Sequence, residues 1–145
     1  MNSKQRLEFI LAAIFLMSCI CTFLNLPFSR LAAVLSGFLL GGLYFYGAFW
    51  LYGDYAIPLI TRIITGLLFS LAVLACMFWL LKWPLFGLYS VISCIGFGLI
   101  IIVSIFNSKN TGYKQLLYRC IFFIIVLIAL NAVNFLVRHV PFRLI

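Results

Sequence analysis

The sequence has almost no negative charge. Among its 145 residues only Glu8 and Asp54 are acidic, whereas hydrophobic residues make up 67% of the chain. A water-soluble domain needs a charged exterior, and this chain lacks the residues to build one. The composition therefore excludes a soluble globular protein and predicts an integral membrane protein in contact with the lipid bilayer.

Acidic side chains are also missing from the middle of every long apolar run. Glu8 lies at the entrance of the first run, and Asp54 lies in a turn. Proton- and sodium-coupled transporters usually carry a buried acid within a span, so we do not expect coupling of that kind. The single histidine, His139, has no acidic neighbour in the sequence, which leaves no acid–base pair for catalysis. We expect a protein that is not an enzyme and that binds no cofactor.

The five cysteines do not form a disulfide or metal-binding motif. None belongs to a Cys-x-x-Cys pair, and Cys19 and Cys21 would point in nearly opposite directions on a helix. We interpret all five as small packing residues of apolar helices. Thiol redox chemistry is the alternative.

Basic residues give the chain a formal net charge of +8. They lie near the ends of apolar runs, where they set orientation and reach lipid phosphates. The largest local group is Lys109, Lys114 and Arg119, which is too sparse for a face that binds nucleic acid. A cytoplasmic N-terminus places more of the basic residues on the cytoplasmic side, and we predict that orientation in a bacterial inner membrane.

Five apolar runs are long enough to cross a bilayer, since a helical span takes about 20 apolar residues. They cover residues 7–26, 31–52, 63–81, 85–106 and 116–137. The breaks are short, and the longest polar one covers residues 107–115. The sequence predicts an all-α polytopic membrane protein, a single bundle over residues 1–145 with about five transmembrane helices.

The first four runs contain a repeat. A shift of 57 residues aligns Pro27 with Pro84 and matches further leucine, cysteine, valine, serine and glycine positions, including Gly41 with Gly98. Because each unit would contain two spans, the copies would have the same orientation. We predict two parallel helical-hairpin repeats, the first over residues 7–53 and the second over residues 61–108. The extra span, 116–137, would stand outside the repeat and pack across it.

Two asparagines in the last run are candidates for a specific contact. Asn131 and Asn134 lie three residues apart, so they occupy adjacent parts of one helix face. An amide surrounded by hydrocarbon needs a hydrogen-bond partner, which another helix can supply. We interpret the pair as a contact between helices, and the alternative is the lining of a solute or ion pathway.

Glycines mark candidate helix–helix contacts. Gly37 and Gly41 form a Gly-x-x-x-Gly face, which allows another helix backbone to approach closely. Gly96 and Gly98 lie at a comparable depth in the second unit, and we expect a similar approach there.

A turn between two predicted spans resembles a known hairpin. Residues 78–84 read Phe-Trp-Leu-Leu-Lys-Trp-Pro. They are similar to the Phe-Lys-x-x-His-Trp-Pro hairpin of small membrane proteins related to GldL, the inner-membrane motor subunit of gliding motility and type IX secretion. Agreement is limited to Phe78, Trp83 and Pro84. The resemblance implies a two-span hairpin and not the motor activity, because the intramembrane glutamate and cytoplasmic domain of such a motor are missing. The residues expected at the membrane interface are Pro27, Lys82, Trp83 and Pro84.

Three classes of function fit these patterns. The first is a structural or accessory subunit that binds other membrane proteins or a second copy of itself, in keeping with the short loops and glycine faces. The second is a translocator of small solutes or lipids, in keeping with the repeated hairpins and the polar residues of the last span. The third is a membrane enzyme that acts on a thiol or a lipid. Only the cysteines and the basic residues support this class. The sequence favours the first class.

Overall fold

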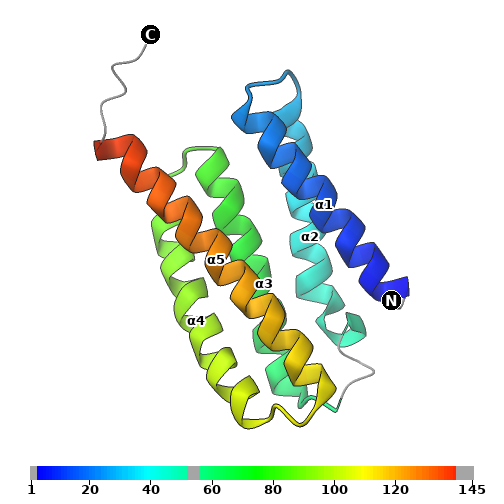
Figure 1. Ribbon diagram of the computed structural model, residues 1–145. Coiled ribbons are helices and arrows are strands. Elements are labelled where there is room, and N and C mark those ends of the chain that lie inside the picture. The colour runs from blue at the N-terminus through cyan, green and yellow to red at the C-terminus, as the bar shows by residue number, and fades with distance from the viewer. Residues whose placement is uncertain (1–2, 52–55, 140–145) are drawn as a thin grey trace.

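The computed structural model describes residues 3–51 and 56–139. This part of the chain contains five helices: α1 (Ser3–Phe23), α2 (Ser29–Leu51), α3 (Leu59–Leu80), α4 (Phe86–Phe106) and α5 (Thr111–His139). Each helix runs antiparallel to the one before it, so the start of α1 and the end of α5 lie at opposite ends of the bundle (Figure 1). Asp54 and the predicted repeat boundary at residue 53 lie outside the described residues, as does the side chain of His139.

The all-helical prediction is confirmed, but one predicted loop is wrong. α5 begins at Thr111, within the segment 107–115 that hydropathy assigned to a loop. Asn110 caps this helix, because its Oδ1 atom accepts a hydrogen bond from the Gly112 amide at 2.9 Å. Its Nδ2 atom donates to the Ala56 carbonyl at 3.1 Å, which fixes the helix start against the chain before α3. Polar residues after position 110 therefore form the first turn of a helix.

The turns that end α1 and α3 share one backbone geometry. Asn25 and Lys82 adopt left-handed conformations with φ of 55° and 56°. The Leu26 amide donates to the Cys21 carbonyl at 3.1 Å, and the Trp83 amide makes the equivalent bond in the second turn at 2.8 Å. This pattern is a Schellman cap, in which a left-handed residue closes the helix and a proline commonly follows. The cap explains why α1 ends at Phe23, before its predicted boundary at residue 26.

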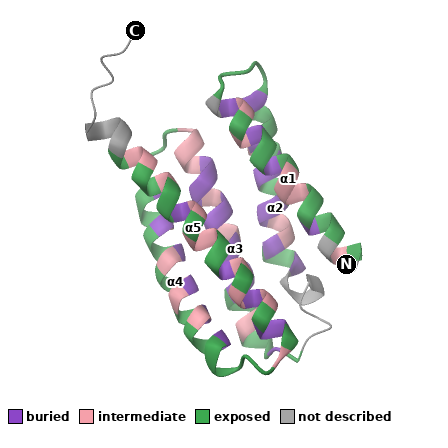
Figure 2. Ribbon diagram, in the orientation of Figure 1, coloured by how far each residue is buried: buried purple, intermediate pink, exposed green. Residues whose placement is uncertain are grey.

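Four of the helices contain stretches long and apolar enough to cross a membrane: Ser29–Gly47, Leu59–Leu80, Phe86–Phe106 and Thr111–Phe135. The outward faces of the bundle are exposed (Figure 2) and carry large apolar side chains, such as Phe9, Phe38 and Leu99, each more than 60% exposed. Water would penalise such a surface, whereas lipid chains accommodate it. The chain is a small polytopic membrane protein whose helices contact the bilayer.

α3 is the central helix of the bundle. It packs against α2, α4 and α5, and its Phe69, Ala72 and Val73 are fully buried. Around Phe69 lie three further rings from three other helices: Tyr44 and Phe97 at centroid distances of 5.1 Å and Phe123 at 5.0 Å. This aromatic cluster of Tyr44, Phe69, Phe97 and Phe123 ties α2, α3, α4 and α5 together.

The position of α5 differs from the prediction. α5 packs against α4 and α3 rather than across both predicted hairpins. It reaches α1 and α2 through side chains alone, of which Arg119 and Phe123 are the main ones.

Two glycines of α2 lie at its interface with α3. A Cβ atom on Gly37 would lie 2.5 Å from the Met77 Sδ atom, so the Met77 side chain of α3 packs directly against this glycine. A Cβ atom on Gly41 would meet the Ser70 Oγ atom at 3.6 Å, which is an ordinary van der Waals distance.

The two predicted glycines of α4 have different surroundings. A Cβ atom on Gly98 would meet nothing within 4 Å, so this glycine makes no close contact inside the chain. The close approach occurs at Gly96, where a Cβ atom would overlap the side chain of Leu68 from α3. Hydropathy gave both glycines a similar depth, but depth does not define which face of a helix meets its neighbour.

Candidate functional site

A buried ion pair joins α1 to α5. The Arg119 Nη2 atom donates to the Glu8 Oε2 atom at 2.6 Å, and the Glu8 side chain is only 9% exposed. The other carboxylate oxygen of Glu8, Oε1, accepts a hydrogen bond from the Tyr44 hydroxyl of α2 at 3.0 Å. Both carboxylate oxygens therefore have a donor, as a buried charge requires. We call the end of the bundle with Glu8, Tyr44 and Arg119 the paired end.

The paired end connects directly to the aromatic cluster. Tyr44 uses its hydroxyl for Glu8 and its ring for Phe69 and Phe123, with the Phe123 centroid at 5.9 Å. One residue thus belongs to the polar contact and to the apolar core, which is typical of tyrosine.

This network was not predicted from the sequence. Glu8 lies near the start of α1, and Arg119 was grouped with the basic residues that set orientation, but their pairing was not expected. Glu8 is 7% exposed overall, and Arg119 lies toward it from a helix more than a hundred residues later. A lone carboxylate in an apolar helix was the one available signal, because such a group needs a buried cation as partner.

A cleft opens at the opposite end of the bundle. It has a volume of about 750 Å³ and lies between the α1–α2 turn, the α3–α4 turn and the last turns of α5. Binding sites for small molecules commonly have volumes of about 300–1,000 Å³, so the cleft is large enough for a ligand. We call this end the cleft end; the lining residues are Thr22, Asn25, Arg30, Trp79, Leu80, Lys82, Trp83, Pro84, Phe86, Gly87, Val133 and Asn134.

The charged groups that line the cleft are both basic. Arg30 comes from the first turn of α2, and Lys82 is the left-handed residue of the α3–α4 turn. Neither makes an ion pair with any residue in the described ranges 3–51 and 56–139. The described lining of the cleft is therefore electropositive, and no carboxylate belongs to it.

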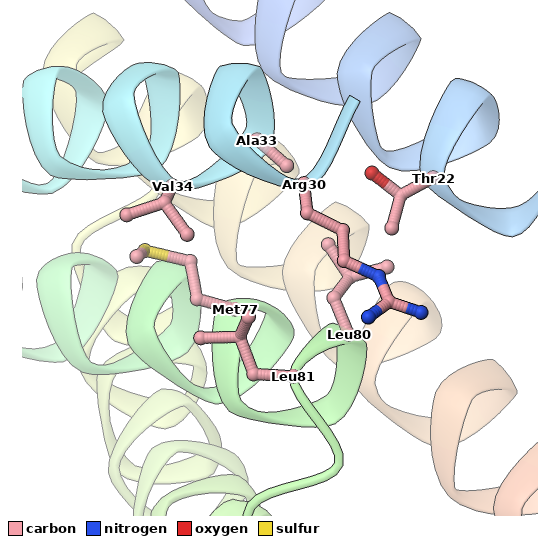
Figure 3. A pocket seen from close by; sticks show the side chains of 7 residues that line it. All are labelled: Thr22, Arg30, Ala33, Val34, Met77, Leu80 and Leu81. Carbon is pink, nitrogen blue, oxygen red and sulfur yellow. The ribbon is translucent and has the colours of Figure 1, made fainter. Parts of the chain in front are cut away.

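A narrow pocket next to the cleft helps to position Arg30. Figure 3 shows the Arg30 side chain extending from the start of α2 toward Leu80 of α3, with Thr22 of α1 on its other side. The pocket has no space for a water molecule. The apolar stem of Arg30 thus packs between helices while its guanidinium group reaches the cleft, the usual behaviour of long basic side chains at a membrane interface.

The two asparagines of α5 have different surroundings. The Asn131 Nδ2 atom donates to the Ser90 hydroxyl of α4 at 2.6 Å and to the Leu127 carbonyl at 2.8 Å. Asn134 lines the cleft instead. The structure therefore places one asparagine in a contact between helices and the other at the candidate ligand site, although they are only three residues apart.

The predicted turn residues divide in a similar way. Lys82, Trp83 and Pro84 line the cleft, whereas Pro27 is exposed in the other turn and is not part of the lining. Gly37 and Gly41 are buried within the bundle, whereas Gly98 is half-buried with open space beside its Cα atom.

The described residues contain no disulfide bond and no cluster of metal-ligating side chains. All five cysteines are free thiols, and Cys76 and Cys120 are buried. Within residues 3–51 and 56–139 no three metal-ligating side chains come together.

Comparison with protein-family models, curated proteins and solved structures gives no match to this chain. The resemblance of residues 78–84 to the GldL-type hairpin thus stays a prediction.

Proposed function

We propose that this protein is a non-enzymatic translocator of lipids, which binds an amphiphilic molecule in the cleft between its two hairpins. The observation that carries the proposal is the contrast between the ends of the bundle. At the cleft end, about 750 Å³ separates the α1–α2 turn from the α3–α4 turn and α5. At the paired end, Glu8 holds α2 and α5 to α1. An opening on one side of the membrane and a connection on the other is the arrangement expected of a translocator in one of its states.

The lining of the cleft suits an amphiphile. Trp79 and Trp83 have an apolar ring and a polar N–H group, a combination that favours the boundary between lipid chains and headgroups. Leu80, Phe86 and Val133 supply apolar surface beside them. A headgroup and a hydrocarbon chain could both find contacts there.

We further propose that the two hairpins are repeats of one unit. Five backbone hydrogen bonds around the first turn recur around the second, with the same spacing between donor and acceptor. The matching donors are Leu24, Asn25, Leu26, Ser29 and Ala32 in the first turn and Leu81, Lys82, Trp83, Phe86 and Tyr89 in the second. The turns differ at one place, because Phe28 has a φ of 61° whereas Leu85 has a φ of −75°. Equal offsets in sequence and in hydrogen bonding support a duplication.

In this proposal α1 is a fifth span, and the N-terminus is cytoplasmic in a bacterial inner membrane. α1 has 21 residues, the same length as α4. Single cysteines at positions 28 and 85, in a chain without its native cysteines, should both react with a reagent added from the periplasmic side. Labelling from opposite sides would contradict both the repeat and the five-span topology.

Lipid exchange between leaflets tests the proposed function. The purified full chain is placed in vesicles that carry a fluorescent phospholipid, and a membrane-impermeant reagent bleaches the outer leaflet. We expect loss of fluorescence to continue past the outer leaflet in vesicles with protein and to stop there in vesicles without it. Folded protein that leaves the inner leaflet untouched would contradict the proposal.

One observation favours the accessory-subunit class as a second candidate. Gly98 of α4 makes no close contact within the chain, so its small surface is open to a helix of another protein or of a second copy. Purification in mild detergent tests this candidate. A stoichiometric membrane partner that is lost on Gly98→Leu substitution would support it, and a monomeric chain without a partner would oppose it.

A further inference from the structure

The two basic residues of the cleft have no counter-charge within the described part of the chain. The whole sequence contains two acids, of which Glu8 is bound to Arg119 at the paired end and Asp54 lies outside the described residues. Arg30 and Lys82 make no ion pair in the described ranges. Both residues are exposed in the same cleft, where an anion between them would lower the repulsion of their charges.

The neighbours of these bases are uncharged groups that can hydrogen-bond to an anion. Asn25 lines the cleft from the α1–α2 turn, and Asn134 lines it from α5. Three carbonyls near the end of each of α1 and α3 already accept bonds from the amides of their own turns, namely those of Ile20, Cys21, Thr22, Met77, Phe78 and Trp79. The polar part of the lining is therefore rich in donors, which is the chemistry that recognises phosphate.

The backbone also holds Lys82 in place. A lysine at positive φ is uncommon, and the Schellman cap stabilises it here through the amides of Lys82 and Trp83. The first turn has an uncharged residue, Asn25, at the equivalent left-handed position. The charge at residue 82 is thus not needed for the geometry of the turn.

We propose that the cleft binds the phosphate group of an anionic amphiphile, with Arg30 and Lys82 in contact with the phosphate and the tryptophan and apolar side chains along the hydrocarbon chain. This inference rests on the proposed function and adds the chemical class of its substrate. A soluble phosphate ester shares the headgroup chemistry, but the apolar wall of Leu80, Phe86 and Val133 favours the amphiphile.

Retention of defined lipids tests the inference. The full chain is purified and exchanged into bilayer discs of phosphatidylcholine that contain a small fraction of phosphatidylglycerol, and the bound lipid is measured by native mass spectrometry. We expect the wild-type chain to retain phosphatidylglycerol in preference to phosphatidylcholine. The double variant Arg30→Gln/Lys82→Asn should lower that preference by roughly 30-fold, because each basic group near an anionic lipid contributes about 1 kcal/mol.

The control variant is Lys109→Gln/Lys114→Gln. It removes the same amount of charge from two exposed residues near the start of α5, at the other end of the bundle. We expect it to lower the lipid preference by much less than the cleft variant does, because lipids at the open surface of the bundle exchange with the bulk bilayer. An equal loss in both double variants, or no loss in either, would overturn the inference, since the attraction would then not depend on the cleft.

The single variant Lys82→Asn shows whether a lower lipid preference can occur without a folding defect. Asparagine tolerates the left-handed conformation, so the turn should persist and the preference should fall by about fivefold. Normal thermal unfolding of this variant together with an unchanged lipid preference would overturn the inference.

Two further measurements distinguish an amphiphile from soluble phosphate, and the binding proposal from the translocation proposal. Inorganic phosphate and glycerol phosphate at millimolar concentration should not displace the lipid, and full displacement would overturn the assignment of an amphiphile. Lipid exchange between leaflets without headgroup preference would overturn the substrate class and leave translocation standing. Selective retention of phosphatidylglycerol without exchange would overturn translocation and leave the binding site standing.

Discussion

The two ends of the bundle differ in how their charged side chains are paired. At the paired end Glu8 is buried, and both of its oxygens accept hydrogen bonds, one from Arg119 and one from Tyr44. At the cleft end Arg30 and Lys82 line an opening with no acidic partner in the described part of the chain. A buried charge with partners connects helices, whereas exposed cations at an opening, such as Arg30 and Lys82, can attract an anionic ligand. The comparison therefore assigns cohesion to the first end and binding to the second.

The largest expected effect is at the paired end. Glu8→Gln removes the carboxylate that pairs with the Arg119 guanidinium, so it weakens the contact between α1 and α5. Loss of one partner of a buried pair costs about 3–5 kcal/mol, and we expect a fall of that order in the free energy of unfolding in detergent. Arg6→Gln, on the exposed side of the same helix, should have little effect.

A double-mutant cycle sharpens that result. If Glu8 and Arg119 act as a pair, Glu8→Gln together with Arg119→Met should destabilise the protein by less than the sum of the single changes. Additive effects would contradict the pairing. Preference for anionic lipid should persist in all three variants, provided that the two ends act separately.

The next effect concerns the hydroxyl of Tyr44. Tyr44→Phe keeps the ring beside Phe69 and Phe123 but removes the hydrogen bond to Glu8. A bond to a charged group contributes about 1.5–3 kcal/mol, and thermal unfolding should report a loss in that range. Tyr46→Phe is the matched control, because Tyr46 is 77% exposed. Equal stability of the two variants would mean that the hydroxyl contributes nothing to the paired end.

Glycine substitutions test the packing between the two ends. Gly37→Ala forces Met77 and Phe15 to move, since its Cβ atom would lie 2.5 Å and 3.0 Å from their atoms. Overpacking of this kind costs about 1–3 kcal/mol of unfolding free energy. Gly42→Ala meets nothing within 4 Å and should leave thermal unfolding unchanged or slightly raised, because alanine favours the helix. A greater loss at Gly42 would contradict the packing of α2 on α3.

The smallest effect distinguishes the two asparagines. Asn131→Leu removes the hydrogen bond to Ser90, and bonds between membrane helices contribute about 0.6 kcal/mol on average and rarely above about 1.7 kcal/mol. We expect a slight fall in thermal stability with unchanged lipid preference. Asn134→Leu should leave thermal stability unchanged and lower the lipid preference, because Asn134 lines the cleft. The same outcome for both variants would remove the distinction between a helix contact and a ligand contact.

Much of the fold could be predicted from local sequence. Apolar runs predict helices in a membrane because every backbone N–H and C=O group must be paired there, and all five helices follow from that rule. The beginning of α5 did not follow, because Thr111, Lys114 and Gln115 are polar and hydropathy does not detect the cap made by Asn110. α5 begins within polar sequence because the Asn110 side chain supplies a hydrogen-bond acceptor to the first turn of the helix.

The candidate site was harder to predict, because its residues come from separate helices. Lys82, Trp83, Pro84 and Asn134 were noted for their own chemistry, yet sequence spacing could not show that they share one cleft with Arg30. Glu8 and Arg119 were interpreted one by one as interfacial residues. Their pairing depends on how α1 and α5 lie around α3.

The sequence by itself determined that this protein lies in a membrane, and it determined where the helices and turns form. A chain with 67% hydrophobic and only 8% charged residues is suited to a membrane, and Asn25 and Lys82 close their helices through backbone bonds to nearby residues. Only the tertiary structure decided which charges are paired and which line a cleft. Hydrophobicity and capping act over a few neighbouring residues, whereas an ion pair such as Glu8–Arg119 depends on positions in space that are set by the packing of the whole bundle.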